Sequence, residues 1–190
     1  MRLKIVTVGE PVLRRPTVRL SKKQLLSSSI QDLIEHMRET VRDAPGVGLA
    51  APQIGESLQL AVIEDKAEYH KLLSKVELKE RGRKPVPFHV LANPTLELLT
   101  EPTEIFFEGC LSLPGFTALV PRAKRVRVTC LDHRGASRVI EASGWYARIL
   151  QHEIDHLNGL LYIDQMETHS FSSLENFARH WKNRSPHRPC

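Results

Sequence analysis

Apolar residues recur at every third or fourth position in two stretches of the chain, and this spacing predicts two main helices. Ser29 is the expected N-cap of the first helix, which runs to about Asp43. Its apolar positions are Ile30, Leu33, Ile34, Met37 and Val41. The second helix is expected from about Ser143 to Asn158, and Gly159 is placed to end it.

Segments with β-branched or alternating apolar residues predict strands. They are Leu58–Glu64, Val86–Asn93, Ile105–Phe107, Arg125–Leu131 and Arg138–Ala142. Residues 1–26 are expected to be extended, because Pro11 and Pro16 interrupt any helix there. The strongly charged residues 66–85 predict an exposed, partly helical insertion, and a short helix is expected around Leu174–Trp181. The pattern indicates one strand-rich α+β domain.

Composition narrows the class of protein. The chain has 190 residues, 41% of them hydrophobic, which is ordinary for a globular domain with a real core. No apolar run approaches the ~20 residues of a membrane helix, so we expect no membrane partner. Three cysteines at irregular spacing favour a reducing compartment. The net charge is 27 − 22 = +5, spread along the chain, which indicates a solvated surface and is compatible with weak attraction to ribosomal RNA.

The second predicted helix carries the candidate chemistry. Its sequence QHEIDH contains His152 and His156, and histidines four apart point to the same side of a helix. They can therefore bind one metal ion, and Glu153 can move a proton of a metal-bound water. Trp145 and Ile149 continue the face of the two histidines upstream, as the wall of a substrate pocket would.

Two histidines need a third protein ligand, and two sources compete. Some metalloproteases extend this motif to H-E-x-x-H-x-x-G-x-x-H; Gly159 matches, but Tyr162 stands where the last histidine belongs. Glu167 and His169 follow outside the helix. The upstream source is Cys110, whose thiolate would be a strong ligand. Cys130 fits a buried strand residue, and Cys190 an exposed thiol at the C-terminus.

Three blocks in order, GVGLAAPQ at 46–53, EGCLS at 108–112 and QHEIDH at 151–156, resemble the signature motifs of the peptide deformylases. The resemblance covers about residues 4–167. It implies an α+β fold with antiparallel or mixed sheets around a central metal-binding helix. It also implies a catalytic domain at 1–167, with a polar, basic extension at 168–190. Residues 142–149 are most similar to the organellar, mitochondrial-type branch.

The resemblance implies a hydrolase that removes the N-formyl group from the formyl-methionine of newly made polypeptides. Cys110, His152 and His156 would bind one divalent metal, with Fe²⁺ as the natural ion and Zn²⁺ or Ni²⁺ as substitutes. Glu153 would act as general acid and base, and metal-bound hydroxide would attack the formyl carbon. The side chain of Gln53 and the backbone N–H of Leu111 would stabilise the oxyanion.

The substrate is expected to bind as an added strand, with Gly48 taking part through its backbone. Val47, Trp145 and Ile149 would form the methionine pocket, and Glu108 and Gly109 complete the predicted substrate site. The partners implied are N-formyl-methionyl nascent peptides near the ribosome. The resemblance is also compatible with a homodimer. The compartment would be a mitochondrion or a plastid, with a bacterial cytoplasm also open.

Two further hypotheses compete with this one. A zincin-type endopeptidase would keep its metal without Cys110. A non-enzymatic basic module that docks to ribosomes or RNA would hold the metal only for structure, and would not depend on Glu153.

Overall fold

The computed structural model describes residues 1–44 and 46–182. Its helices are α1 (Lys22–Leu25), α2 (Ser28–Asp43), α3 (Lys75–Glu80), α4 (Trp145–Leu157) and α5 (Leu174–His180). Short 3₁₀ turns lie at Pro11–Arg14, Ala51–Ile54, Ala67–Leu72, Tyr162–Asp164 and Thr168–Ser170. The strands are β1 (Gly48–Ala50), β2 (Leu60–Asp65), β3 (Val86–Leu98), β4 (Glu104–Cys110), β5 (Leu113–Arg122), β6 (Arg125–Leu131), β7 (Ser137–Ser143) and β8 (Ser172–Ser173).

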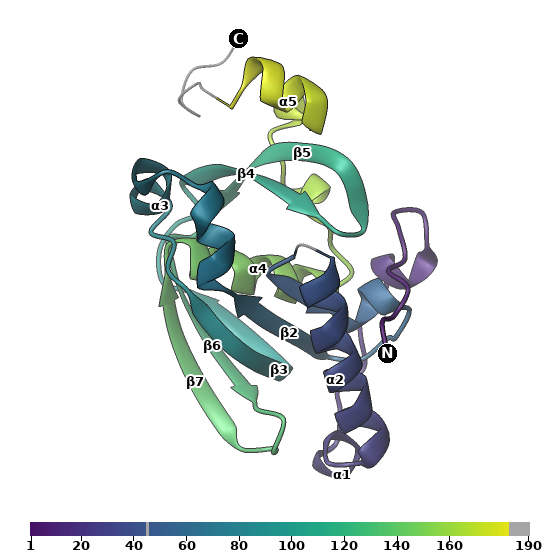
Figure 1. Ribbon diagram of the computed structural model, residues 1–190. Coiled ribbons are helices and arrows are strands. Elements are labelled where there is room, and N and C mark those ends of the chain that lie inside the picture. Colours follow the sequence, from purple (N-terminus) through teal and green to yellow (C-terminus); the bar gives the residue numbers. More distant parts are fainter. Residues whose placement is uncertain (45, 183–190) are drawn as a thin grey trace.

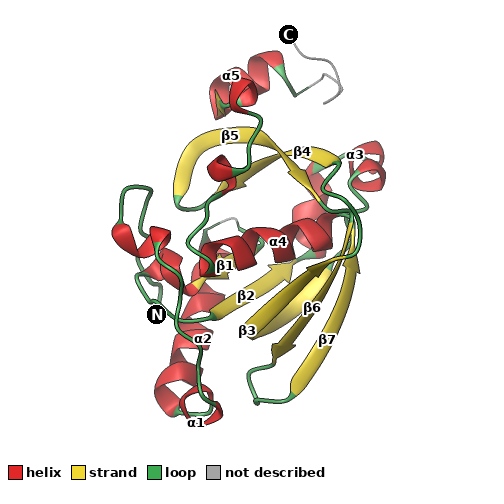
Figure 2. Ribbon diagram, turned by 180° about the vertical axis from the view of Figure 1, so that it is seen from behind, coloured by secondary structure: helices red, strands yellow, loops and turns green. Residues whose placement is uncertain are grey.

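The strands form two antiparallel sheets, in the orders β1-β2-β3-β6-β7 and β4-β5-β8. Figure 1 shows α4 between the larger sheet and the β4–β5 hairpin, and Figure 2 shows the same layering from behind. The fold expected from the resemblance, sheets around a central helix, is confirmed. None of the helices in the described ranges is both long and apolar enough to span a membrane.

Both faces of β2 are buried, which explains why its sequence is apolar without alternation. Ala61 and Ile63 face the core that contains Leu150 and Ile154 of α4. Leu60 and Val62 face a second core, which α2 covers through residues such as Met37. Strand β6 instead has one buried face, with Val126, Val128 and Cys130 inward, so it shows the alternation from which it was predicted.

Most predicted elements are confirmed within a few residues, with three corrections. Residues 1–26 are not wholly extended, because Pro11–Arg14 form a 3₁₀ turn and Ser21 caps α1 through a capping box with Gln24. The N-cap of α2 is Ser27 rather than Ser29. Strands β1, β5 and β8 were not predicted: β1 and β8 have only three and two residues, and Pro114, Gly115 and Pro121 interrupt the pattern of β5.

Candidate active site

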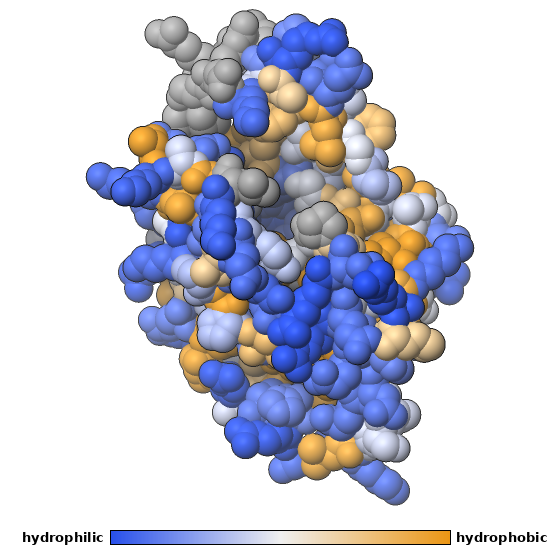
Figure 3. Space-filling model, in the orientation of Figure 1, coloured by the Kyte–Doolittle hydropathy of each residue, from blue (hydrophilic) through white to orange (hydrophobic). Residues whose placement is uncertain are grey.

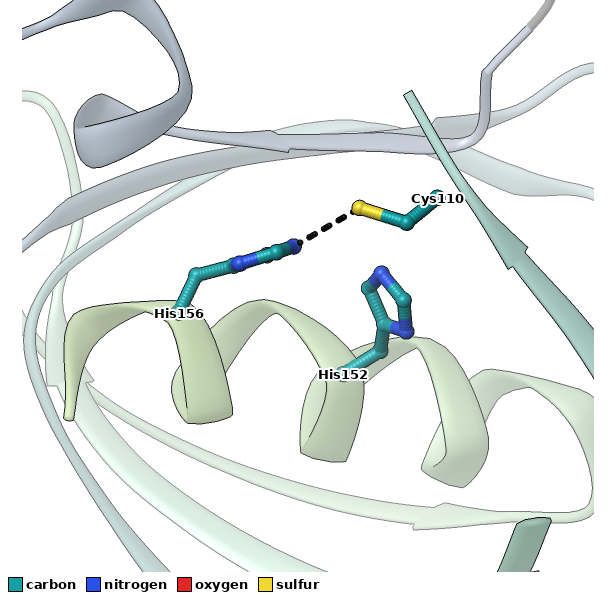
Figure 4. A group of neighbouring side chains, drawn as sticks. All are labelled: Cys110, His152 and His156. Carbon is teal, nitrogen blue, oxygen red and sulfur yellow. Dashed lines mark hydrogen bonds between the residues drawn. The ribbon is translucent and has the colours of Figure 1, made fainter. Parts of the chain in front are cut away.

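Helix α4 and the end of β4 bring three metal-binding side chains together. His152 and His156 project from one side of α4 toward Cys110, the last residue of β4 (Figure 4). The Sγ of Cys110 lies 3.3 Å from Nε2 of His156. One ligand atom from each residue lies within 4.8 Å of the other two. The structure thus brings together the three residues predicted as ligands, although Cys110 lies about forty residues upstream of the histidines.

The geometry of this triad fits a single divalent ion. Ligand atoms 2.0–2.3 Å from a tetrahedral metal lie roughly 3.3–3.8 Å apart, which agrees with the 3.3 Å between Cys110 and His156 and is compatible with the 4.8 Å limit on all three pairs. Nδ1 of His152 lies 2.9 Å from Glu108, which leaves its Nε2 for a metal. Nδ1 of His156 is buried and has no hydrogen-bond partner among the described residues. A thiolate with two imidazoles suits Fe²⁺, Zn²⁺ or Ni²⁺.

Other metal donors considered from the sequence stay outside this group. Within residues 1–44 and 46–182, the group of side chains close enough together to share a metal ion contains neither Glu167 nor His169. Tyr162, which stands at the final position of the longer protease motif, is buried, and its ring centroid lies 6.4 Å from that of His152. Its hydroxyl forms no hydrogen bond with the described residues. The geometry therefore favours the upstream cysteine as the third ligand.

Glu108 is the centre of a buried network of charges behind the triad. Its carboxylate accepts hydrogen bonds from Arg122 at 2.9 and 3.0 Å, from Arg148 at 2.7 Å, and contacts His152. Burial raises the pKa of Glu108, but the charge of Arg122 and the hydrogen bonds from His152 and Arg122 outweigh burial. The pKa of Glu108 therefore lies well below its usual range, and the group stays ionised.

This network fixes the orientation of both α4 and His152. Asp155 on α4 binds the same Arg122 of β5, at 2.5 Å. Gln151 on α4 exchanges hydrogen bonds with the backbone of Ala123. Arg122 was not singled out from the sequence, because the basic residues of the chain were interpreted as a solvated surface. The pairing of β5 with β4 brings the guanidinium of Arg122 within hydrogen-bonding distance of Glu108.

Glu153 lies beside the triad in an environment that favours its protonated form. The side chain is buried, and Oε2 has no hydrogen-bond partner among the described residues. Burial raises the pKa of the carboxyl to about 7, and the charge of His152 limits the rise. A carboxyl with a pKa near neutrality can both accept and return a proton.

Gln53 faces the triad from the opposite side. Its Nε2 lies 3.5 Å from Cys110 Sγ and 3.3 Å from Ser112 Oγ, and its Oε1 accepts a hydrogen bond from the backbone of Ala50. The N-terminal segment also joins the two loops around the site. Val6 donates a backbone hydrogen bond to Gln53, and Val8 donates one to Ser112. The amide donor is thus held in place from three directions.

A cavity of about 550 Å³ opens over these residues, and the surface is hollowed there (Figure 3). All the residues predicted for the site line it except His156, a predicted ligand that is buried. Residues not predicted for the site also line it: Gly46, Arg81, Arg83, Phe107, Leu113, Pro114, Gly115, Phe116, Arg148 and Leu174. Arg81 and Arg83 come from the insertion at 66–85, Arg148 comes from α4, and Leu174 begins α5. Nothing in the local sequence around Arg81, Arg83 or Leu174 indicates that these residues line a pocket.

The fold and this site define a class of protein: a hydrolase that uses one divalent metal, with a carboxylate for proton transfer and a groove for its substrate. Comparison with known proteins gives the family. The family model described as "Polypeptide deformylase" matches residues 2–171. The chain belongs to the polypeptide deformylase family, whose enzymes are metal-dependent and remove N-formyl groups from nascent polypeptides.

Similar proteins come from both organelles and bacteria. The chain is 48% identical to "Peptide deformylase 1A, chloroplastic" of Solanum lycopersicum, over 90% of this chain and 62% of that protein. It is 47% identical to "Peptide deformylase 3" of Streptomyces avermitilis, over 98% of this chain and 81% of that protein. The fold is similar to the Met-Ala-Ser-bound class I type b peptide deformylase of Acinetobacter baumannii, with a TM-score of 0.77 and 28% identity over 87% and 99% of the two chains. The chain thus spans less than two thirds of the tomato protein.

Proposed function

We propose that this chain hydrolyses the formyl group from N-formyl-methionyl peptides, with the groove above Cys110, His152 and His156 as its active site. The observation that carries this proposal is the position of Glu153. A buried carboxyl with a pKa near neutrality lies beside three metal-binding side chains and lines a cavity large enough for a peptide. This arrangement provides the groups that hydrolysis of an amide requires.

Cys110, His152 and His156 would hold one divalent ion, with Fe²⁺ as the proposed natural metal and Zn²⁺ or Ni²⁺ as substitutes. The bound ion would act as a Lewis acid toward the formyl oxygen and make water a stronger nucleophile. Glu108 keeps His152 in the tautomer whose Nε2 faces the thiolate. Because Glu108 stays ionised, it also strengthens the donor character of that imidazole.

Glu153 would take the proton from the attacking water at its carboxylate and later give it to the amine that leaves. The amide of Gln53 already points at Cys110 and has Nε2–H to offer to a developing oxyanion. The backbone N–H of Leu111, next to Cys110, is the second proposed donor. Both donors belong to fixed segments, so little reorganisation is needed during the reaction.

The peptide would bind as an additional strand. Strand β1 is at one edge of the larger sheet and β4 is at one edge of the smaller sheet, and residues of both line the cavity. Gly48 and Gly109 would offer backbone groups from the two edges, while Val47, Trp145 and Ile149 would surround the methionine side chain. The side chain of Glu108 is engaged with arginines, so we propose that its substrate contact uses the backbone.

Residues 1–167 are proposed as the catalytic domain and 168–190 as its extension, of which only the residues up to Lys182 are described.

An organellar, mitochondrial-type assignment is supported by the chloroplastic relative, while the Streptomyces relative is almost as similar. Localisation of a fluorescent fusion in the source cells would separate organelle from cytoplasm. Sedimentation of the chain alone would test the proposed homodimer. Sedimentation together with ribosomes that translate formylated peptides would test the proposed ribosome proximity.

The direct test is release of formate from formyl-Met-Ala-Ser by the Fe²⁺-loaded chain, prepared without oxygen. Glu153→Gln should lower the rate by about 10²–10⁴-fold while the metal content stays unchanged. The exposed Glu56 provides a matched control, and Glu56→Gln should keep full activity. Folded, metal-loaded protein that releases no formate would overturn the proposal, and metal retention in a Cys110→Ala variant would favour the endopeptidase hypothesis.

A further inference from the structure

Three arginines line the cavity, and one of them differs from the others in its partners. Arg83 forms a bidentate ion pair with the buried Asp65, at 2.8 and 2.9 Å. Arg148 binds Glu108 at 2.7 Å. No carboxylate within residues 1–44 and 46–182 forms an ion pair with Arg81. Arg81 therefore leaves one unneutralised positive charge in the wall of the groove.

The backbone around Arg81 is firmly positioned. Arg81 is the C-cap of α3, and Gly82 follows with a φ of 55°. The carbonyl oxygens of Arg81 and Gly82 pack so closely on Gly144 that a Cβ there would lie 2.9 Å from each. On the other side, Arg83 is tied to Asp65. The C-terminal end of the insertion is thus fastened both to the start of α4, through Arg81 and Gly82, and to the end of β2, through Arg83.

The side chain of Arg81 is positioned by Trp145. Its guanidinium carbon lies 4.9 Å from the centre of the Trp145 ring, a cation–π distance. The side chain is half-buried, and burial together with the charge of Arg83 lowers the pKa of Arg81, although the charges of Glu77 and Glu80 act in the opposite direction. A guanidinium that has lost water and gained no carboxylate can bind an anion with little loss of entropy.

The position of Arg81 indicates which part of a substrate it can reach. Trp145 precedes His152 by seven residues on α4, which corresponds to about 10 Å along the helix axis. An extended peptide advances about 3.3 Å per residue, so this distance equals about three residues. If the peptide runs from the triad along α4, past a methionine side chain that contacts Trp145, a carboxylate in its second or third residue or at the end of a tripeptide comes within reach of Arg81.

We propose that Arg81 is a specificity-determining residue that binds a carboxylate of the peptide substrate downstream of formyl-methionine. The proposal rests on the proposed function of this groove. It assigns to the insertion at 66–85 a role in substrate selection, through one charged side chain that contacts no part of the metal triad. Side chains of Asp or Glu and the terminal carboxylate of a short peptide share this chemistry, and the test separates them.

The test compares three matched peptide pairs by formate release. Formyl-Met-Ala-Ser against its amide tests the terminal carboxylate. Formyl-Met-Glu-Ser-amide against formyl-Met-Gln-Ser-amide tests the second residue, and formyl-Met-Ala-Glu-amide against formyl-Met-Ala-Gln-amide tests the third. The wild-type chain should prefer the acidic member of at least one pair by about five-fold in kcat/KM, mainly through KM. The preference should weaken as salt is added.

Variants connect this preference to Arg81. Arg81→Met should abolish it and leave release from the neutral peptides within about two-fold, because the stem on Trp145 is retained. Arg81→Lys should keep part of the preference, and Arg81→Glu should reverse it in favour of a lysine-bearing peptide. Lys84→Met is the matched control, since Lys84 is exposed, lies in the same segment and does not line the cavity. It removes the same charge and should change nothing.

Binding of the deformylated peptides Met-Glu-Ser-amide and Met-Gln-Ser-amide, and of the third-position and terminal pairs, gives the same comparison without turnover. Titration calorimetry would therefore test Arg81 even if no formate were released, an outcome that would contradict only the proposed function. Equal binding of acidic and neutral peptides in all three pairs would overturn the inference. An Arg81→Met variant that lowers the affinity for acidic and neutral peptides by the same factor would also overturn it.

Discussion

Gly48 and Glu153 lie so close together that a Cβ placed on Gly48 would be 2.2 Å from Oε1 of Glu153. The resemblance implied only that Gly48 takes part in peptide binding through its backbone. The structure gives a nearer reason for the glycine, because the carboxylate of α4 packs directly on the backbone of β1. This contact fixes the direction in which Glu153 points.

Gly48→Ala should therefore impair catalysis by displacing Glu153. A shift of about 1 Å in a catalytic group can cost about 100-fold, and we expect a loss of that order in the rate of formate release. The metal triad lies outside the contact, so the metal content should stay at its wild-type level. Steady-state kinetics together with metal analysis would check both statements.

The double variant Gly48→Ala, Glu153→Gln gives the decisive control for this prediction. If the alanine acts through Glu153, it should add almost nothing to the loss caused by Glu153→Gln. Multiplicative losses would show instead that Gly48 contributes to the reaction on its own, for example through backbone contact with the peptide.

Cys110→Ala should remove the metal, while Cys130→Ala should keep it. Both thiols are free, but Cys130 is buried in the core on β6, where burial raises its pKa to about 11. Elemental analysis after desalting would give the ion content of each variant. We expect at most a small loss of stability, about 1 kcal/mol, for Cys130→Ala. A full complement of metal in Cys110→Ala would refute the assignment of the third ligand.

Glu108→Gln should destabilise the fold, because Arg148 and one side of Arg122 would lose their buried partner. Removing one member of such a pair typically costs about 3–5 kcal/mol. Urea unfolding at neutral pH, compared with the wild-type chain, would measure the difference. A cost below about 1 kcal/mol would mean that water replaces the carboxylate in this network.

Acid should remove the same contribution in the wild-type chain. The pKa of Glu108 is lowered on folding from an ordinary value of 4.5. Its stabilisation is therefore complete above about pH 4.5 and is lost as the pH falls toward the lowered pKa. The free energy of unfolding should fall more steeply with acid in the wild-type chain than in Glu108→Gln. Parallel pH profiles between about pH 3 and 7 would contradict this assignment.

A chain truncated after Glu167 should bind metal but lose stability. All three predicted ligands precede the cut, whereas Phe107 would lose its ring contacts with Phe177 and Trp181, at 4.6 and 5.4 Å. Two aromatic pairs are worth about 2 kcal/mol, which thermal unfolding would detect. A chain ending at Lys182 is the control. Loss of metal from the shorter chain would place the boundary of the catalytic domain further downstream.

The sequence by itself determined the features that depend on neighbours along the chain. The period of apolar residues on α4 and the i, i+4 spacing of His152 and His156 are properties of a single helix. The alternation in Arg125–Leu131 likewise predicted β6, because one face of that strand is buried and the other is not. Cys110 was one of two candidate sources of the third ligand because of its thiolate, and the resemblance of three blocks selected it, whereas its spacing from the histidines gave no geometric reason.

Only the tertiary structure decided which distant residues meet. Strand β5 escaped prediction because proline and glycine interrupt its pattern, and with it went the position of Arg122 under Glu108. Arg81 lies in a charged insertion that was predicted from the sequence to be exposed. In the structure its backbone packs on Gly144, and the residue lines the groove. Local periodicity reports whether a residue is buried. The identity of its partner depends on sheet pairing and helix packing, which involve residues far apart in the sequence.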